Sequence, residues 1–189
     1  MSYIPPDNAK ISIEQMVDTR TSKTRYFRNR ARGNKSPFFM LAITSPPMPY
    51  AEFMAYSAMV NSLEGSLEVF DLPNPLPALA SFSGHRPDTT FNRGLKVIDI
   101  DTDADYKPGD FIQFDNHKKV YQIASKSNIS GAIRLTLTCP LVETISTATT
   151  VLYGDDVVFQ VCLNNQFSAE VDAGKSKFGV IDVELIEQA

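Results

Sequence analysis

The chain consists largely of short runs in which apolar and polar residues alternate, with turn-forming residues between one run and the next. The alternation is clearest in residues 95–100 (LKVIDI), 133–138 (IRLTLT) and 178–186 (FGVIDVELI). A period of two places successive side chains on opposite faces of a β-strand. Short strands at roughly ten-residue spacing are typical of sandwiches and barrels, so the sequence predicts a mainly β protein. The other predicted strands are residues 37–44, 66–72, 110–114, 120–123, 151–153 and 157–163.

Residues 49–63 depart from this pattern and predict a helix. Apolar residues recur there at helical spacing and form one stripe. Pro49 suits the first turn of a helix, and Gly65 is placed to end it. The stripe consists of Phe53, Tyr56, Val60 and Leu63.

Positive charge concentrates near the start of the chain. Residues 1–94 carry 10 basic and 8 acidic side chains (+2), whereas residues 95–189 carry 8 and 14 (−6). Six of the cations fall within residues 23–35 (KTRYFRNRARGNK). Such a run suits a solvated face, a contact with an acidic protein surface, or a nucleic acid, and the negative net charge disfavours the last. Residues 1–24, which precede and overlap this run, predict an extended arm or a weakly patterned edge strand.

The residues that could carry chemistry are isolated from one another. His85 and His117 have no cysteine, second histidine or nucleophilic serine within motif distance, and His117 is expected to be a solvated residue of a polar hairpin turn. The run DIDTDAD (residues 99–105) resembles the start of a calcium loop. Ala104 and Asp110 stand where an EF-hand needs glycine and glutamate, so we interpret the run as an acidic strand end. We therefore expect no catalytic residue, no metal site and no cofactor.

Cys139 and Cys162 lie in apolar strand-like runs far apart in sequence. We interpret them as small buried hydrophobic residues, with a disulfide or a reactive thiol as the alternatives. So little cysteine is typical of a protein made in a reducing cytoplasm. The sequence contains no apolar run long enough to cross a membrane, and its N-terminus does not have the pattern of a signal peptide.

Residues 107–123 (KPGDFIQFDNHKKVYQI) carry a resemblance to a known family. A Gly-Asp pair leads into an apolar strand, a short turn follows, and a strand containing Val-Tyr-x-Ile completes the unit. With this unit the chain resembles the distal tail protein of long-tailed, non-contractile siphophages, most closely the T5-type version. The similarity continues more loosely through residues 133–140, 153–163 and 179–186. The order strand, proline-rich turn, helix and strand over residues 38–72 resembles the core of that family.

The resemblance implies a virion protein of the phage tail tip, made in the host cytoplasm. It implies a β-sandwich domain with one helix that forms a ring, usually a hexamer, and an inserted OB-like β-barrel. Residues 1–83 and 158–189 would form the ring domain, and residues 84–157 the barrel. Its partners would be further copies of the chain, the tail tube protein, the baseplate hub or tail tip protein, and other tail ring or fibre proteins. No membrane insertion and no specific nucleic acid are expected.

We therefore predict a structural, non-enzymatic protein that joins the tail tube to the receptor-binding apparatus. The assembly interface is expected to include Arg25, Arg28, Arg30 and Arg32. The alternative is a host-surface carbohydrate-binding module that acts through the OB-like domain, because such barrels often bind oligosaccharides. Its ligand face would include His117, Lys118, Lys119 and Tyr121. Binding of single-stranded nucleic acid is a third and weaker alternative.

Overall fold

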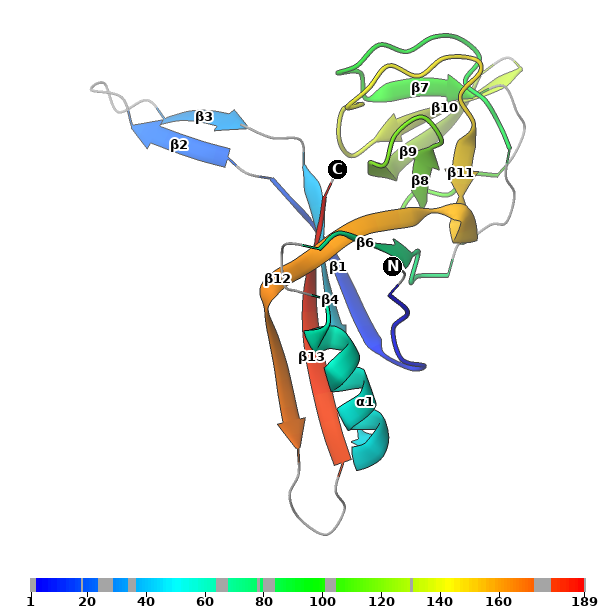
Figure 1. Ribbon diagram of the computed structural model, residues 1–189. Helices are drawn as coiled ribbons and strands as arrows, with labels where there is room; N and C mark the ends of the chain where they lie inside the picture. The colour runs from blue at the N-terminus through cyan, green and yellow to red at the C-terminus, as the bar shows by residue number, and fades with distance from the viewer. Residues whose placement is uncertain are drawn as a thin grey trace.

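The computed structural model confirms a mainly β protein with one α-helix among the residues that it describes (Figure 1). These are residues 3–17, 19–23, 29–33, 37–63, 68–77, 79, 84–100, 105–129, 131–171 and 178–188. For residues 19–23, 29–33 and 165–167 only the backbone is described. The described strands form one six-stranded sheet, one five-stranded sheet and one two-stranded hairpin.

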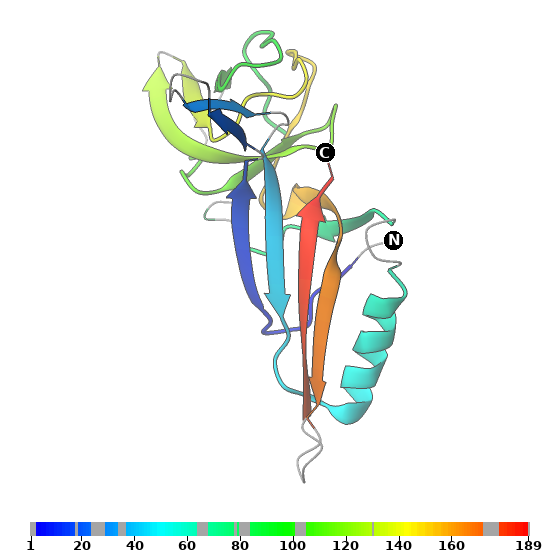
Figure 2. The ribbon, with the colours of Figure 1, turned by 90° about the vertical axis from the view of Figure 1, so that its left-hand side faces the viewer.

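The six-stranded sheet combines the two ends of the chain. Its main path runs β1-β4-β13-β12-β6, and every neighbouring pair on that path is antiparallel. β5 pairs with the start of β13. Figure 2 shows the long strands of this sheet side by side. The strands are β1 (Lys10–Met16), β4 (Phe38–Thr44), β5 (Met48–Pro49), β6 (Phe70–Pro73), β12 (Val158–Val171) and β13 (Phe178–Glu187).

The predicted helix is confirmed as α1 (Tyr50–Asn61), which lies along β13 (Figure 1). Pro49 is the residue before its first turn, and the hydroxyl of Ser62 donates to the carbonyl oxygen of Met59 at its end, 2.6 Å away. The predicted stripe faces the sheet: Phe53, Val60 and Leu63 are buried and Tyr56 is half-buried. The ring of Phe53 fills the space that a β-carbon would need at Gly179, so this glycine allows the helix to approach β13 closely.

The five-stranded sheet has the order β11-β8-β9-β10-β7. β11 and β7 are its two ends and do not pair with each other, so the described strands do not close into the predicted barrel. β9 continues to Ile129, well past the predicted end at Ile123, because its second half pairs with β10. The 3-10 helix η2 (Gly154–Asp156) follows β11 directly. The strands are β7 (Val97–Ile100), β8 (Phe111–Phe114), β9 (Val120–Ile129), β10 (Ala132–Leu137) and β11 (Val151–Tyr153).

Each of the two larger sheets has its own buried apolar cluster. The first cluster includes Leu41, Val60 and Val183, together with Tyr3, which lies near the N-terminus and is 1% exposed. The second cluster lies within residues 98–153. Phe111 and Val120 of the five-stranded sheet belong to the first cluster, so the two parts share apolar packing. The division into the predicted ring domain and inserted domain stays a prediction.

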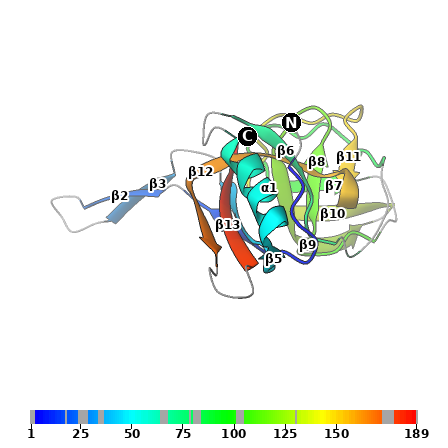
Figure 3. The ribbon, with the colours of Figure 1, turned by 60° about the horizontal axis from the view of Figure 1, so that its bottom comes forward.

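The N-terminal residues form part of the sheet, as the edge-strand alternative predicted. β1 is an end strand of the six-stranded sheet and pairs with β4 over its whole length. The chain then leaves the sheet and forms a hairpin of β2 (Thr19–Lys23) and β3 (Asn29–Gly33), which pair only with each other among the described strands. Figures 1 and 3 show this hairpin pointing away from the rest of the molecule.

Candidate functional site

The predicted assembly residues belong to this hairpin. Arg30 and Arg32 lie on β3, opposite Ser22 and Arg20 of β2. Arg25 and Arg28 lie outside the described residues. The structure thus places two of the four arginines on a projecting element, and their role in assembly stays a prediction.

The four residues predicted as a ligand face lie in or near the turn between β8 and β9. Lys118 is exposed and His117 is half-buried, but Lys119 and Tyr121 are 2% and 0% exposed. Lys119 and Tyr121 are therefore covered by the protein itself and do not lie on an exposed face. The cause is a carboxylate beneath the turn.

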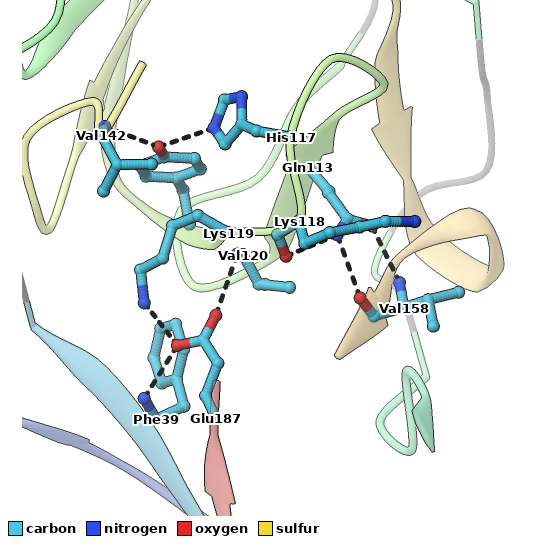
Figure 4. A network of polar contacts seen from close by, with 10 residues as sticks. Phe39, Gln113, His117, Lys118, Lys119, Val120, Val142, Val158 and Glu187 are labelled. Atoms are coloured by element: carbon cyan, nitrogen blue, oxygen red, sulfur yellow. Dashed lines mark hydrogen bonds and ion pairs between the residues drawn. The ribbon is translucent and has the colours of Figure 1, made fainter. Parts of the chain in front are cut away.

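That carboxylate belongs to Glu187, the last residue of β13 (Figure 4). Glu187 Oε2 accepts a charged hydrogen bond from Lys119 Nζ, and it also accepts the backbone N–H of Phe39 at 3.0 Å. Its other oxygen, Oε1, accepts the backbone N–H of Val120 at 3.0 Å. The side chains of Lys119 and Glu187 are 1% and 0% exposed, so this is a fully buried ion pair with its acceptors satisfied.

A second polar link lies beside the ion pair. The side-chain amide of Gln113 donates to the carbonyl oxygens of Lys118 (2.8 Å) and Val158 (3.0 Å), and its oxygen accepts the backbone N–H of Val158 at 3.1 Å. Gln113 lies on β8 and Val158 begins β12, so the amide connects the two larger sheets. Gln113 is 3% exposed, so water cannot reach these groups, and loss of the hydrogen bonds would leave buried polar atoms without partners and destabilise the fold.

Aromatic packing surrounds the polar links. The rings of Phe39, Phe111 and Phe159 meet edge to face, with centroids 5.4–5.9 Å apart. The ammonium group of Lys119 lies 5.2 Å from the centroid of the Phe39 ring. Edge-to-face geometry and a nearby cation are both favourable arrangements for aromatic rings. We call this region the joint, and it comprises Phe39, Phe111, Gln113, Lys119, Val120, Val158, Phe159 and Glu187.

His117 is held in place rather than solvated. The hydroxyl of Tyr121 accepts the backbone N–H of Val142 at 3.0 Å, so its own proton is free to donate to His117 Nε2, 2.8 Å away. His117 Nδ1 then donates to the side-chain oxygen of Asn116 at 2.8 Å. The imidazole stacks on the ring of Phe114 with centroids 5.6 Å apart. These directions correspond to a neutral imidazole. His117 is half-buried and both of its ring nitrogens have hydrogen-bond partners, so the expectation of a solvated turn residue is wrong.

Burial sets the protonation of this histidine. It lowers the pKa of His117, and the nearby carboxylates of Glu143 and Asp115 oppose that shift. Burial also raises the pKa of the Tyr121 hydroxyl. Both groups are therefore neutral near pH 7, which keeps the hydrogen bond between them in a single donor and acceptor arrangement.

In the acidic run that resembled a calcium loop, the carboxylates of Asp99 and Asp105 form ion pairs with lysine and arginine side chains of the chain itself. Asp99 forms a two-pronged ion pair with Arg134, with both N–O distances 2.7 Å. Asp105 binds Lys107 and Lys126, which lower its pKa to about 2. Asp101 and Asp103 lie outside the described residues. Within the described residues, no group of three or more histidine, cysteine, aspartate or glutamate side chains is arranged to hold a metal ion.

Two small clefts adjoin the joint. One, of about 160 Å³, lies between β8 and β12 and carries the carboxylates of Asp71, Asp115 and Asp156 beside Lys118. The other, of about 190 Å³, is lined largely by apolar atoms around Phe111. Both are below the volume of usual small-molecule sites, roughly 300–1,000 Å³.

The two cysteines agree with the favoured interpretation. Cys139 and Cys162 are buried free thiols. Burial raises the pKa of each thiol, which lowers the fraction of reactive thiolate. The described residues also contain no helix that is long and apolar enough to cross a membrane.

Comparison with known proteins adds no relative. No model of a protein family matches the sequence, and a search of curated proteins finds no significant match.

Proposed function

We propose that this chain is a structural protein of a phage tail tip, a distal tail protein whose copies form a ring, most simply a hexamer. The ring would join the tail tube to the tail tip and its receptor-binding apparatus, and the chain would have no catalytic role. In this proposal residues 1–83 and 158–189 form a sandwich-like ring domain. Residues 84–157 form an OB-like insertion.

The observation that carries the proposal is the β2–β3 hairpin. Within the described chain it pairs with no other strand, and it extends away from both cores (Figures 1 and 3). A two-stranded hairpin is only marginally stable alone in water, so a projecting hairpin gains stability when a partner covers it. Such stabilisation is expected of an arm that packs against a neighbouring subunit.

Charge supports a second copy as that partner. Residues 19–33 carry six cations and no acidic residue. The remainder of the chain carries 12 basic and 22 acidic side chains, a net charge of −10. A strongly cationic arm and an acidic body favour head-to-tail contacts between copies, and head-to-tail contacts are those that close a ring.

The joint supports a scaffold role rather than a binding role. A buried ion pair, a buried amide and three interlocked phenylalanines fix the five-stranded sheet on the six-stranded sheet. A protein that passes mechanical load between a tube and a tip needs such a rigid connection between its parts. The carbohydrate-binding alternative loses support, because Tyr121, the aromatic residue of the predicted ligand face, is buried.

Mass measurement of arm variants tests the proposal. Native mass spectrometry of the wild-type protein at rising salt is expected to show a ring that dissociates as salt screens the arm. Changing Arg25, Arg28, Arg30 and Arg32 to serine is expected to lower the assembled fraction and to remove most of the salt dependence.

A matched control removes four positive charges elsewhere, at Arg86, Arg93, Lys96 and Lys118, all of them exposed. This control is expected to assemble like the wild type. Assembly and salt dependence that are the same in the wild type and in the arm variant would refute the role of the arm.

A further inference from the structure

The six-stranded sheet has two open edges on opposite sides. β1 pairs with β4 on one side and with no described strand on the other. At the opposite side, β6 pairs only with residues 158–161 of β12, so the later part of β12 has no described strand beyond it. Open edges present unpaired backbone N–H and C=O groups and favour pairing with another chain.

The direction of the strands makes these two edges complementary. β1, β4, β13 and β12 are antiparallel in succession, so β12 runs opposite to β1. Rotation about an axis parallel to the strands keeps every strand direction. A second copy placed in this way would bring its β1 beside β12 of the first copy in antiparallel orientation, and the regular pattern of the sheet would continue across the boundary.

The side chains also match across this boundary. On β1, Ile11 and Ile13 pack against the core and are only half-buried, whereas Ser12 is exposed on the other face. On β12, Ala169 and Val171 pair with the positions of β13 that face the core, and both are exposed. Joining the edges would cover these apolar side chains on one face and leave polar residues together on the other.

One register satisfies the charged residues as well. If Lys10 lies opposite Glu170, then Ser12 lies opposite Ser168 and Ile11 lies opposite Ala169. Lys10, Glu170 and Ser168 are exposed in the single chain, so they are available for this pairing. Opposite charges directly across a pair of strands are favourable, and like charges are unfavourable.

We infer that β1 of one copy pairs antiparallel with residues 168–171 of β12 in the next copy, with Lys10 opposite Glu170. This seam rests on the proposed ring and identifies its subunit interface. The seam is head-to-tail: each copy pairs through β1 with one neighbour and through β12 with the other.

Directed disulfides test the seam in the full-length protein. Opposed residues on antiparallel strands have β-carbons roughly 4.5–5.5 Å apart, close enough for a disulfide after small adjustments. Proteins carrying Ser12→Cys and Ser168→Cys are mixed and mildly oxidised, and a covalent dimer is expected in the mixture but not in either protein alone. The doubly substituted protein is expected to give a ladder of covalent oligomers.

The control replaces Ser168→Cys by Ala169→Cys, an exposed neighbour whose side chain lies on the opposite face. Cross-linking with Ser12→Cys that is equally efficient in this control, or in the Ser12→Cys protein alone, overturns the seam. A ring without the Ser12–Ser168 cross-link also overturns it and leaves the proposed function intact. A protein that is monomeric throughout overturns both.

A charge exchange tests the register independently. Lys10→Glu places two like charges together at the seam and is expected to lower the assembled fraction. Adding Glu170→Lys to that variant restores an opposite pair and is expected to recover assembly. If the second change brings no recovery, this register is wrong.

Discussion

The buried pair of Lys119 and Glu187 offers the sharpest test of how the two parts of the molecule are held together. In Lys119→Met the aliphatic part of the side chain is largely kept and the ammonium group is lost. Glu187 then keeps the backbone N–H groups of Phe39 and Val120 but has no countercharge. The carboxylate remains 0% exposed, so water cannot take the place of the missing charge.

The expected cost is large. Removing one partner of a buried ion pair destabilises a protein by about 3–5 kcal/mol. Whole domains are stable by about 5–15 kcal/mol, so this is a substantial fraction of the total. For a chain of this size each kcal/mol changes the melting temperature by about 2–4 °C, which predicts a decrease of roughly 6–20 °C.

Two further variants identify the cause. Adding Glu187→Gln to Lys119→Met removes the uncompensated charge, so the double variant is expected to lose less stability than Lys119→Met alone. Lys126→Met is the matched control, because Lys126 pairs with Asp105, which is exposed at the surface. This control is expected to have little effect.

Guanidinium unfolding followed by circular dichroism and tyrosine fluorescence provides the free energies, since the chain has seven tyrosines and no tryptophan. A Lys119→Met protein as stable as the Lys126→Met control would refute the conclusion that the ion pair of Lys119 and Glu187 stabilises the joint.

Three other predictions concern parts of the same fold. Burial lowers the pKa of His117 in the folded state below its usual value of 6.5. Below about pH 6.5 the unfolded state therefore binds more protons than the folded state. The free energy of unfolding should decrease as the pH falls from about 6.5 through the lowered pKa. Denaturant titrations across this range should show a weaker pH dependence of stability in His117→Gln, and an unchanged dependence would contradict the half-buried, neutral imidazole. Gly179→Ala should destabilise the protein by about 1–3 kcal/mol, because the new methyl group meets the ring of Phe53; thermal melting checks this, and Phe53→Leu should recover part of the loss. Cys139 and Cys162 should react with a thiol reagent only after unfolding, and rapid labelling of either thiol in the folded protein would contradict their burial.

The fold was predictable where local pattern and tertiary packing agree. The apolar stripe of residues 49–63 predicted α1, and three of its four members are buried. Alternation in residues 133–138 and 178–186 predicted β10 and β13 to within about a residue at most ends. In these segments the face that the pattern makes apolar is also the face that the core covers.

Long-range pairing explains the features that the local pattern missed. Lys119 follows a polar turn, and its partner lies 68 residues away, so nothing local indicates that it is buried. One signal was nevertheless present at the other end of the pair. Residues 181, 183 and 185 of β13 face the core, and Glu187 continues the same alternation, which predicts a buried carboxylate in need of a cation.

The β2–β3 hairpin shows a different limit of sequence reasoning. Its residues are polar and cationic and show no apolar alternation, and among the described strands the hairpin belongs to neither of the larger sheets. Hydrophobic periodicity reports only on strands that the chain itself covers. A hairpin outside both larger sheets therefore leaves no periodic signal in the sequence, only a run of charge.

The mass of the assembled protein tests the central claim most directly. Native mass spectrometry of the full-length protein over a range of concentrations, together with negative-stain images, measures the number of copies and the symmetry. The proposed function predicts a closed ring, with a mass six times the 21.0 kDa of one chain and images with six-fold symmetry. A monomer at every concentration, or an open filament, would contradict it.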